Sequence, residues 1–327
     1  MEIKSILIIR NGAIGDVVHT TGLYRAIKKA YPNIEIDYAT SYVTAPLLKG
    51  DEDLRDVFIF EDYTYKYMLS LVSKIKNKGY DLIINLQPQL KFNLMCAMTG
   101  IKTIKYKKDF SKHAVVNFFE TAKSELPAIE LDSELRLNVL EKNKPYVLLK
   151  CHEMTERKNV VFNMSATPQR QGRKWPVDYY KELALRLINE YNCNILLTGS
   201  AEDKELTSKL VDLHEHIYDY AGKYTITESA TLYSMCDLFI SGDTGPLHIA
   251  SACGKPICIG LYGAMPISRT GVWGDKHYSV AALDSLPCIP CNRRVCKLKN
   301  SQYNPCLQNL KPEVIFNLIK EEKLLED

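Results

Sequence analysis

Short apolar segments that alternate with amphipathic segments constrain the fold of this chain more than any other feature of its sequence. Residues Ser5–Ile9 form one such apolar run, and a helical pattern follows over 16–30. A continuous apolar run indicates a strand buried on both faces, which is typical of a parallel sheet covered by helices. The same succession returns further along, for example at 194–198 and 256–261, and it predicts an α/β fold.

The chain is long enough for two such domains. Its 327 residues are about twice the length of a typical domain. A polar stretch at Glu141–Pro145 separates two series of strand and helix patterns, and the second series opens with a predicted strand at Tyr146–Lys150. We therefore predict a first domain over residues 1–150 and a second over 151–327. The second domain contains a segment rich in Cys and Pro, 286–310, and ends in a helix.

Charge and hydropathy exclude several classes of protein. The 42 Lys and Arg residues nearly balance the 39 Asp and Glu residues, so a net charge of +3 gives no support for nucleic acid as a partner. The longest apolar runs, such as Ile257–Tyr262, are far shorter than the roughly 18 residues of a membrane-spanning helix. Met1–Lys4 leads directly into the first apolar run without the pattern of a secretory signal. We therefore expect a cytoplasmic protein.

A glycine-containing turn follows the first predicted strand, at Arg10–Asp16. Ligands of open α/β sheets bind at the carboxyl ends of the strands, so this turn is a candidate binding loop. Gly12 and Gly15 allow close approach of a substrate, and Asp16 stands near the start of the helix. The alternative interpretation of Asp16 is a plain N-cap. The spacing matches neither the dinucleotide-binding fingerprint nor the phosphate loop of nucleotide triphosphatases.

A second turn of the same kind lies at Ser241–His248. Pro246 suits the first turn of a helix, because a proline has no N–H group to leave unpaired there. The backbone N–H groups of Thr244, Gly245 and Leu247, with the Thr244 hydroxyl, are suited to hold a phosphate or diphosphate. The alternative is only a well-capped helix.

A basic loop precedes the first helix of the second domain. Residues 169–176 include Arg173 and Lys174, followed by Trp175 and Pro176. Clustered guanidinium and ammonium groups suit a diphosphate. A solvated surface loop explains the same cluster equally well.

These segments together resemble the ADP-heptose:lipopolysaccharide heptosyltransferases of glycosyltransferase family 9. Ile6–Pro32 is similar to the opening of that family, with an apolar strand, Arg, a glycine turn and Ile-Gly-Asp-Val-Val. Arg173–Pro176 resembles the family's basic-Trp-Pro segment. Asp243–Ala250 resembles its Asp-Thr-Gly-x-x-His motif, which Gly254–Pro256 and Leu261–Gly263 continue.

The resemblance implies a GT-B fold, in which two Rossmann-like domains face each other across a cleft. The acceptor would bind on the N-terminal side and the nucleotide sugar on the C-terminal side. The implied reaction is a metal-independent, inverting transfer of heptose from ADP-heptose to a hydroxyl of the lipopolysaccharide inner core. Three alternatives remain: another nucleotide sugar or a protein or glycan acceptor, a nucleotide-sugar epimerase, and a nucleotide-sugar-binding protein without turnover.

The resemblance also implies roles for individual residues. Asp16 would be the general base that takes the proton of the acceptor hydroxyl, beside an acceptor-side loop of Arg10, Asn11, Gly12 and Gly15. The cations of the basic loop would neutralise the departing diphosphate, and the second turn would hold it. The predicted donor-side residues are Arg173, Lys174, Asp243, Thr244, Gly245, Pro246, Leu247 and His248. His248 has a second interpretation, in which it packs beneath the turn.

Four of the ten cysteines fall within a short segment near the C-terminus: Cys288, Cys291, Cys296 and Cys306. A C-x₂-C step with two further thiolates suits a structural zinc or iron ion, which would have no open position for catalysis. Reduced thiols packed in a loop and disulfides are the alternatives. No cofactor is expected for catalysis. The cysteines on predicted strands and helices, such as Cys96, Cys236, Cys253 and Cys258, are expected in the core.

Two charged stretches complete the list of candidates. Asp51, Glu52 and Asp53 resemble a D-x-D metal site only superficially, and we expect an exposed acidic loop there. A basic stretch contains Lys102, Lys105, Lys107, Lys108 and Lys112, with Tyr106 and Phe110 among them. It suits phosphorylated lipid or the inner face of the cytoplasmic membrane, where the protein would bind peripherally. The alternative is a solvated loop.

Overall fold

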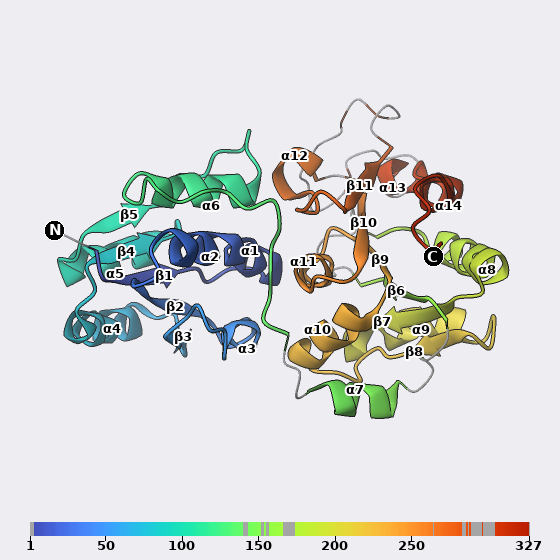
Figure 1. Ribbon diagram of the computed structural model, residues 1–327, viewed down its shortest axis with the longest axis horizontal. Coiled ribbons are helices and arrows are strands. Elements are labelled where there is room, and N and C mark those ends of the chain that lie inside the picture. Colours follow the sequence, from blue (N-terminus) through green and yellow to red (C-terminus); the bar gives the residue numbers. More distant parts are fainter. Residues whose placement is uncertain are drawn as a thin grey trace. The chain divides into compact units, whose positions relative to one another are not determined.

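The structure is a computed structural model in which the chain forms two compact units, Met1–Asn138 and Val139–Asp327. Figure 1 shows each unit as a sheet with helices on its faces. The structure describes residues 3–139, 143–151, 154, 157–165, 174–263, 265–282, 286, 288, 296 and 305–326. Among these residues, no helix combines the length and the apolar character needed to cross a membrane.

The N-terminal unit contains a five-stranded parallel sheet of order β3-β2-β1-β4-β5. Its strands are β1 Ser5–Ile9, β2 Glu35–Ser41, β3 Asp56–Phe60, β4 Leu82–Asn85 and β5 Thr103–Lys105. Its helices are α1 Ile14–His19, α2 Thr21–Ala30, α3 Ala45–Leu48, α4 Tyr65–Lys78, α5 Leu90–Thr99 and α6 Ala114–Lys123. The sheet and its helices confirm the α/β expectation for this half of the chain.

Strand β1 lies at the centre of this sheet, and all five of its residues are buried. Ile6 and Ile8 join the core that α1, α2 and α6 cover. Leu7 and Ile9 join the opposite core, which α4 and α5 cover. Because successive side chains of a strand point to opposite faces, the uninterrupted apolar run is required to fill both cores.

The helix predicted over 16–30 is present as two helices with a break at Thr20. The Thr20 hydroxyl donates back to the Val17 carbonyl at 2.6 Å and also lies 2.6 Å from the Tyr38 hydroxyl. A threonine that bonds to its own helix in this way weakens the regular ladder and bends the chain. The sequence pattern alone does not distinguish one bent helix from two.

The C-terminal unit contains a six-stranded parallel sheet of order β11-β10-β9-β6-β7-β8. Its strands are β6 Asn159–Asn163, β7 Asn194–Thr198, β8 Ile217–Asp219, β9 Leu238–Gly242, β10 Ile257–Tyr262 and β11 Tyr278–Ala281. Its helices are α7 Lys144–Lys150, α8 Val177–Tyr191, η3 Ala201–Asp203, α9 Lys204–Val211, α10 Ile226–Met235, α11 Gly245–Ala252, α12 Ile267–Thr270, α13 Pro305–Gln308 and α14 Pro312–Glu321.

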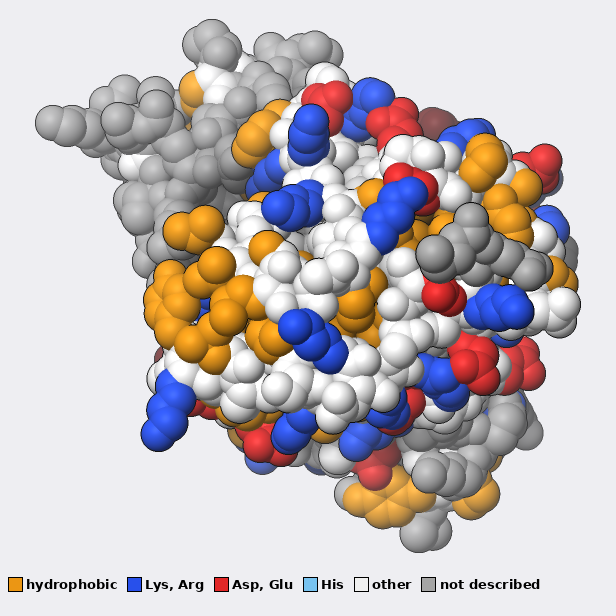
Figure 2. Space-filling model, turned by 90° about the vertical axis from the view of Figure 1, so that its left-hand side faces the viewer, with side chains coloured by type: hydrophobic (Ala, Val, Ile, Leu, Met, Phe, Trp, Pro, Cys, Tyr) orange, Lys and Arg blue, Asp and Glu red, His pale blue; other side chains and the backbone are white. Residues whose placement is uncertain are grey.

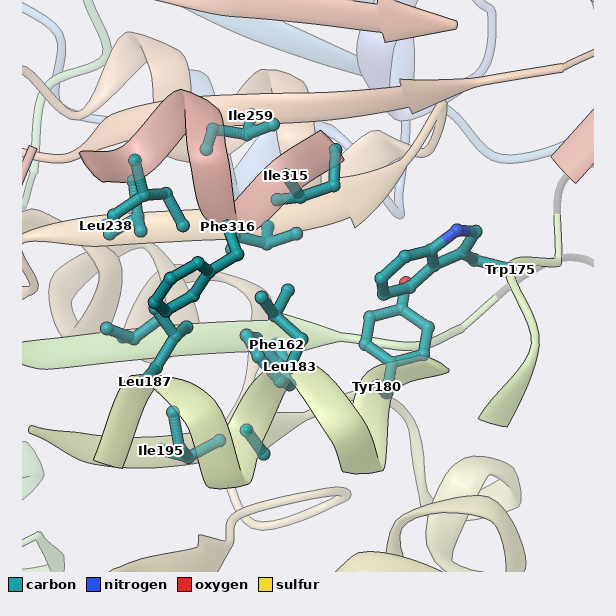
Figure 3. Packing of buried hydrophobic residues seen from close by; sticks show 14 of the residues in the cluster. Phe162, Trp175, Tyr180, Leu183, Leu187, Ile195, Leu238, Ile259, Ile315 and Phe316 are labelled. Carbon is teal, nitrogen blue, oxygen red and sulfur yellow. The ribbon is translucent and has the colours of Figure 1, made fainter. Parts of the chain in front are cut away.

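Helices α8 and α14 cover one core of this unit (Figure 3). Trp175 is buried where α8 begins, and its ring meets the Tyr180 ring edge-to-face with centroids 4.7 Å apart. The indole N–H donates to the Leu310 carbonyl at 2.7 Å, which ties the start of α8 to the segment before α14. A buried indole N–H needs such a partner, so Trp175 anchors the end of the basic loop.

The predicted strand at Tyr146–Lys150 is wrong, because these residues belong to helix α7. Pro145 occupies the first turn of this helix, where its missing N–H costs nothing. An apolar run of four residues cannot be distinguished from a helical segment by periodicity, so the pattern was ambiguous.

The expectation of an exposed acidic loop is wrong for Asp51. Its side chain is fully buried, and it accepts hydrogen bonds from the Arg25 guanidinium at 2.8 Å and the Tyr24 hydroxyl at 2.7 Å. Arg25 also pairs with Asp53 at 2.7 Å. Burial, together with the charge of Asp51, raises the pKa of Tyr24 well above its usual value, so the phenol stays a donor. The acidic stretch thus holds α2 to the loop after α3.

His277 joins β10 to the end of α11. Its Nδ1 accepts from the Cys258 backbone N–H at 3.1 Å, and its Nε2 lies 3.3 Å from the Ser251 carbonyl. Burial, with a smaller contribution from the charge of Lys276, lowers the pKa of His277 to about 4. A ring that accepts at Nδ1 and donates at Nε2 is neutral, so protonation would break the first of these bonds.

We expect the C-terminal unit to lose stability as the pH falls from about 6.5, the usual histidine pKa, towards 4. In this window the unfolded chain binds a proton at His277 that the folded protein does not bind, so the free energy of unfolding decreases, by up to about 3 kcal/mol. Urea unfolding can be followed by tryptophan fluorescence, because both tryptophans, Trp175 and Trp273, lie in this unit. His277→Gln should reduce the pH dependence; an unchanged dependence would contradict the assignment.

Candidate functional site

The first predicted turn lies where the direction of strand succession reverses in the N-terminal sheet. β2 and β3 extend to one side of β1, whereas β4 and β5 extend to the other. The loops that leave the carboxyl ends of β1 and β4 therefore diverge, and ligands of such sheets usually bind at this position. The residues at this edge are Arg10–Asp16 after β1 and Leu86–Gln89 after β4.

Arg10 organises this edge. Its guanidinium donates to the Leu86 carbonyl at 2.6 Å and to the Asp16 carboxylate at 2.8 Å, and it lies 5.1 Å from the centre of the Phe118 ring. The Arg10 side chain is 10% exposed, whereas that of Asp16 is 38% exposed. A nearly buried cation with three partners thus holds a carboxylate whose other side is open to solvent.

Asp16 is not the N-cap of its helix. α1 begins at Ile14, and Ala13 is the N-cap residue, without a side-chain hydrogen bond. Asp16 is therefore in the first turn, where the positive end of the helix dipole favours an anion. The plain N-cap interpretation of this residue is wrong, since its carboxylate is bound to Arg10 instead.

The glycines and Asn11 shape the same loop. A Cβ atom on Gly12 would come within 3.0 Å of both Arg10 Nε and Asp16 Oδ2, so only glycine fits beside the ion pair without displacing it. The Asn11 N–H donates to Gln87 Oε1 at 3.2 Å, and Asn11 Oδ1 accepts from the Tyr63 hydroxyl at 3.1 Å. Gly15 is the second residue of α1 and is buried.

The second predicted turn lies at the corresponding place in the C-terminal sheet. β6 pairs with β9. β7 and β8 follow on the side of β6, whereas β10 and β11 follow on the side of β9. Asn163 and Ser241 are paired at the carboxyl ends of these two strands. The chain then enters α11 through Asp243 and Thr244.

The N-terminus of α11 carries no side-chain cap. Thr244 is the N-cap residue, but its hydroxyl makes no capping hydrogen bond to the helix and lies 3.1 Å from the Ser241 hydroxyl. Thr244, Gly245 and Pro246 are partly exposed. The first backbone N–H groups of a helix have no partner within it, so this end suits an anion.

The remaining residues of this motif are buried beneath the turn. His248 Nε2 lies 3.5 Å from Asp243 Oδ1, with the two side chains 5% and 6% exposed. Leu247 is buried in the core. Of this motif, the structure thus brings the backbone of 244–246 to the surface and keeps the side chains of Asp243, Leu247 and His248 inside.

The basic loop is described only in part. Lys174 is exposed and directly precedes the buried Trp175. Arg173 lies outside the described residues.

Sequence reasoning missed several polar residues at these two edges. Asn85 and Gln87 follow the apolar run of β4, and both are buried. Asn163 is the last residue of β6, and its amide donates to Thr198 at the end of β7. Each is a polar residue at, or just beyond, the carboxyl end of a buried apolar strand, and this signal could have identified them.

The cysteine cluster remains a prediction. Cys288 is exposed and Cys306 is buried, whereas Cys291 lies outside the described residues. Within the part of the chain that the structure describes, no group of three His, Cys, Asp or Glu residues is arranged to hold a metal ion. The expected core position is confirmed for Cys96, Cys236 and Cys258, which are buried, but not for Cys253, which is only partly buried.

Comparison with known proteins agrees with this architecture. The family model described as glycosyltransferase family 9 (heptosyltransferase) matches residues 68–302, well over half of the chain. The lipooligosaccharide heptosyltransferase 2 of Campylobacter jejuni is 24% identical over 312 residues, which cover 94% of this chain and 96% of that protein.

Two solved structures share the fold over nearly the whole chain. The family 9 glycosyltransferase from Veillonella parvula has a TM-score of 0.85 at 19% identity and covers 99% of this chain and 98% of its own. The Escherichia coli ADP-heptose lipopolysaccharide heptosyltransferase II has a TM-score of 0.78 at 21% identity, with 98% of each chain covered. The expected GT-B fold is confirmed. The chain is therefore a glycosyltransferase that belongs to glycosyltransferase family 9, the heptosyltransferase family.

Proposed function

We propose that this enzyme transfers heptose from ADP-heptose to a hydroxyl of the lipopolysaccharide inner core, with inversion at the anomeric carbon and without a catalytic metal. The names of its relatives support the sugar and the acceptor, and the E. coli structure is named for ADP-heptose. The first unit would bind the lipopolysaccharide precursor and the second would bind the nucleotide sugar. The reaction would take place in the cytoplasm, at the inner face of the cytoplasmic membrane.

The Arg10–Asp16 pair is the observation that carries this proposal. Asp16 is partly exposed at the ligand edge of the first sheet, and Arg10 holds its carboxylate in one orientation. An oriented carboxylate that a substrate can reach is suited to act as a general base. Asp16 would take the proton as the acceptor oxygen forms its bond to the anomeric carbon.

The donor half of the reaction needs positive charge. When the bond between the anomeric carbon and the diphosphate oxygen breaks, the electron pair leaves with ADP. The N–H groups at the start of α11 and the cation of Lys174 would stabilise that charge, with Arg173 as a second cation. Asp243 and His248 would support the turn from beneath, because their side chains are buried. Attack by the hydroxyl opposite the leaving group inverts the configuration.

The experiment is an ADP-release assay with ADP-heptose and a lipopolysaccharide precursor truncated before its heptose residues. We expect release of ADP that depends on the acceptor, and a product heavier by one heptose in mass spectrometry. A parallel thermal-shift series with ADP-, UDP- and GDP-sugars should show the largest shift with ADP-heptose. A larger shift with another nucleotide sugar would replace the donor, and transfer to a protein or another glycan would replace the acceptor.

A further inference from the structure

Positive charge is concentrated in one part of the N-terminal unit. The segment from Tyr63 to Lys108 contains nine lysines and a single acidic residue, Asp81, for a net charge of +8 in a chain whose total is +3. Eight of these lysines are exposed: Lys66, Lys74, Lys76, Lys78, Lys102, Lys105, Lys107 and Lys108. Lys78 and Lys102 pair with Asp56 and Glu125 from outside the segment.

Helix α5, in the middle of this segment, is apolar on both of its faces. Phe92, Met95 and Cys96 are buried against the sheet. On the outer face Leu90, Leu94 and Met98 recur at every fourth position and are 74%, 44% and 46% exposed. A helix that is covered only by its own sheet normally turns polar side chains to water, so this outer face is suited to a non-aqueous partner.

The neighbouring helix α4 extends the apolar face. α4 packs beside α5, and it exposes Tyr65 and Leu69, at 57% and 43%. Figure 2 shows hydrophobic side chains gathered into a patch on this end of the molecule, with Lys and Arg side chains at its border. The α4–α5 surface, as we call these five residues and the exposed lysines of the segment, is thus apolar at its centre and cationic at its edge.

We propose that the α4–α5 surface docks the enzyme onto a bilayer that contains anionic phospholipid. The charge pattern favours this occupant, because exposed lysines around an apolar helix face are attracted to anionic headgroups while the apolar side chains enter the interface. The surface contains neither Arg10 nor Asp16, but α5 begins at Leu90, shortly after β4 ends at Asn85, and Leu86 between them accepts the hydrogen bond from Arg10. Docking would therefore bring the acceptor edge to the level of the headgroups, where a lipid-linked acceptor presents its sugars.

The test is co-sedimentation of the purified enzyme with vesicles of phosphatidylethanolamine and phosphatidylglycerol, compared with vesicles of phosphatidylcholine alone. We expect the enzyme to sediment with the anionic vesicles only. The triple variant Leu90→Gln, Leu94→Gln, Met98→Gln should lower the partition coefficient by about tenfold or more. The control Leu213→Gln, Val314→Gln, which replaces side chains of similar exposure in the C-terminal unit, should bind as the wild type does.

A second variant tests the charge separately: Lys66→Gln, Lys74→Gln and Lys105→Gln should weaken binding to anionic vesicles, and added salt should do the same to the wild type. Thermal shift with ADP shows that each variant is folded, and this readout does not depend on the acceptor. Equal sedimentation of the triple variant and the wild type would overturn the proposal, as would equal binding to phosphatidylcholine. It would also be overturned by a wild-type dimer, without vesicles, that the triple variant converts to a monomer.

Discussion

Replacement of Asp16 by Asn is expected to lower kcat by about 10²–10⁴ and to leave the Kd for ADP unchanged. The amide has nearly the shape of the carboxylate but cannot accept the acceptor proton. The loss should therefore appear in turnover alone. Isothermal titration with ADP and the ADP-release assay measure the two quantities on the same preparation.

Asp178→Asn is the matched control for this experiment. Asp178 also lies in the first turn of a helix, α8, but its side chain is 87% exposed and pairs with Lys181 on its own helix. This variant should keep wild-type turnover. Near wild-type kcat in Asp16→Asn would remove Asp16 from the role of base, whatever the control shows.

Arg10→Lys should lower kcat by about 10- to 100-fold with little change in the Kd for ADP. The guanidinium contacts the Leu86 carbonyl and the Asp16 carboxylate through two different nitrogens. A lysine presents one point charge and cannot hold both partners in the same geometry. Asp16 would keep its charge but lose its orientation, so we regard Arg10 as a positioning residue.

Two further variants separate positioning from stability. Gly12→Ala keeps both charged side chains but inserts a methyl group 3.0 Å from Arg10 Nε and from Asp16 Oδ2. It should therefore reduce kcat, as Arg10→Lys does. Arg25→Lys weakens another ion pair of the same unit, with Asp51 and Asp53, and should lower Tm without lowering kcat. Equal losses of kcat in Arg10→Lys and Arg25→Lys would indicate a general loss of structure and contradict the assignment.

The sequence predicted the fold where one local pattern decided the outcome. β1 and the β9–α11 unit were found because a run of buried apolar residues followed by a glycine turn permits few other structures. The same reasoning failed at Tyr146–Lys150, where a short apolar run suits a strand or a helix and Pro145 decided for the helix.

The candidate site was predicted in its positions but not in its contacts. Asp16 and the backbone N–H groups of Thr244, Gly245 and Leu247 were proposed as site residues from their places after buried strands. The partner of Arg10, the Leu86 carbonyl, lies 76 residues away in the chain, and the partner of Asp51 is Arg25, 26 residues away. Such pairings depend on strand order and helix packing, which a single sequence does not encode locally. For this reason the sequence suggested an exposed Asp51, whereas the structure shows Asp51 buried in an ion pair with Arg25.

A crystal structure with acceptor and a non-transferable analogue of ADP-heptose tests the central claim most directly. The account predicts diphosphate oxygens about 2.7–3.2 Å from the backbone nitrogens at the start of α11. It also predicts an Asp16 carboxylate oxygen within hydrogen-bond distance of the acceptor hydroxyl that faces the anomeric carbon. A diphosphate bound away from Thr244–Leu247, or an acceptor hydroxyl beyond the reach of Asp16, would contradict it.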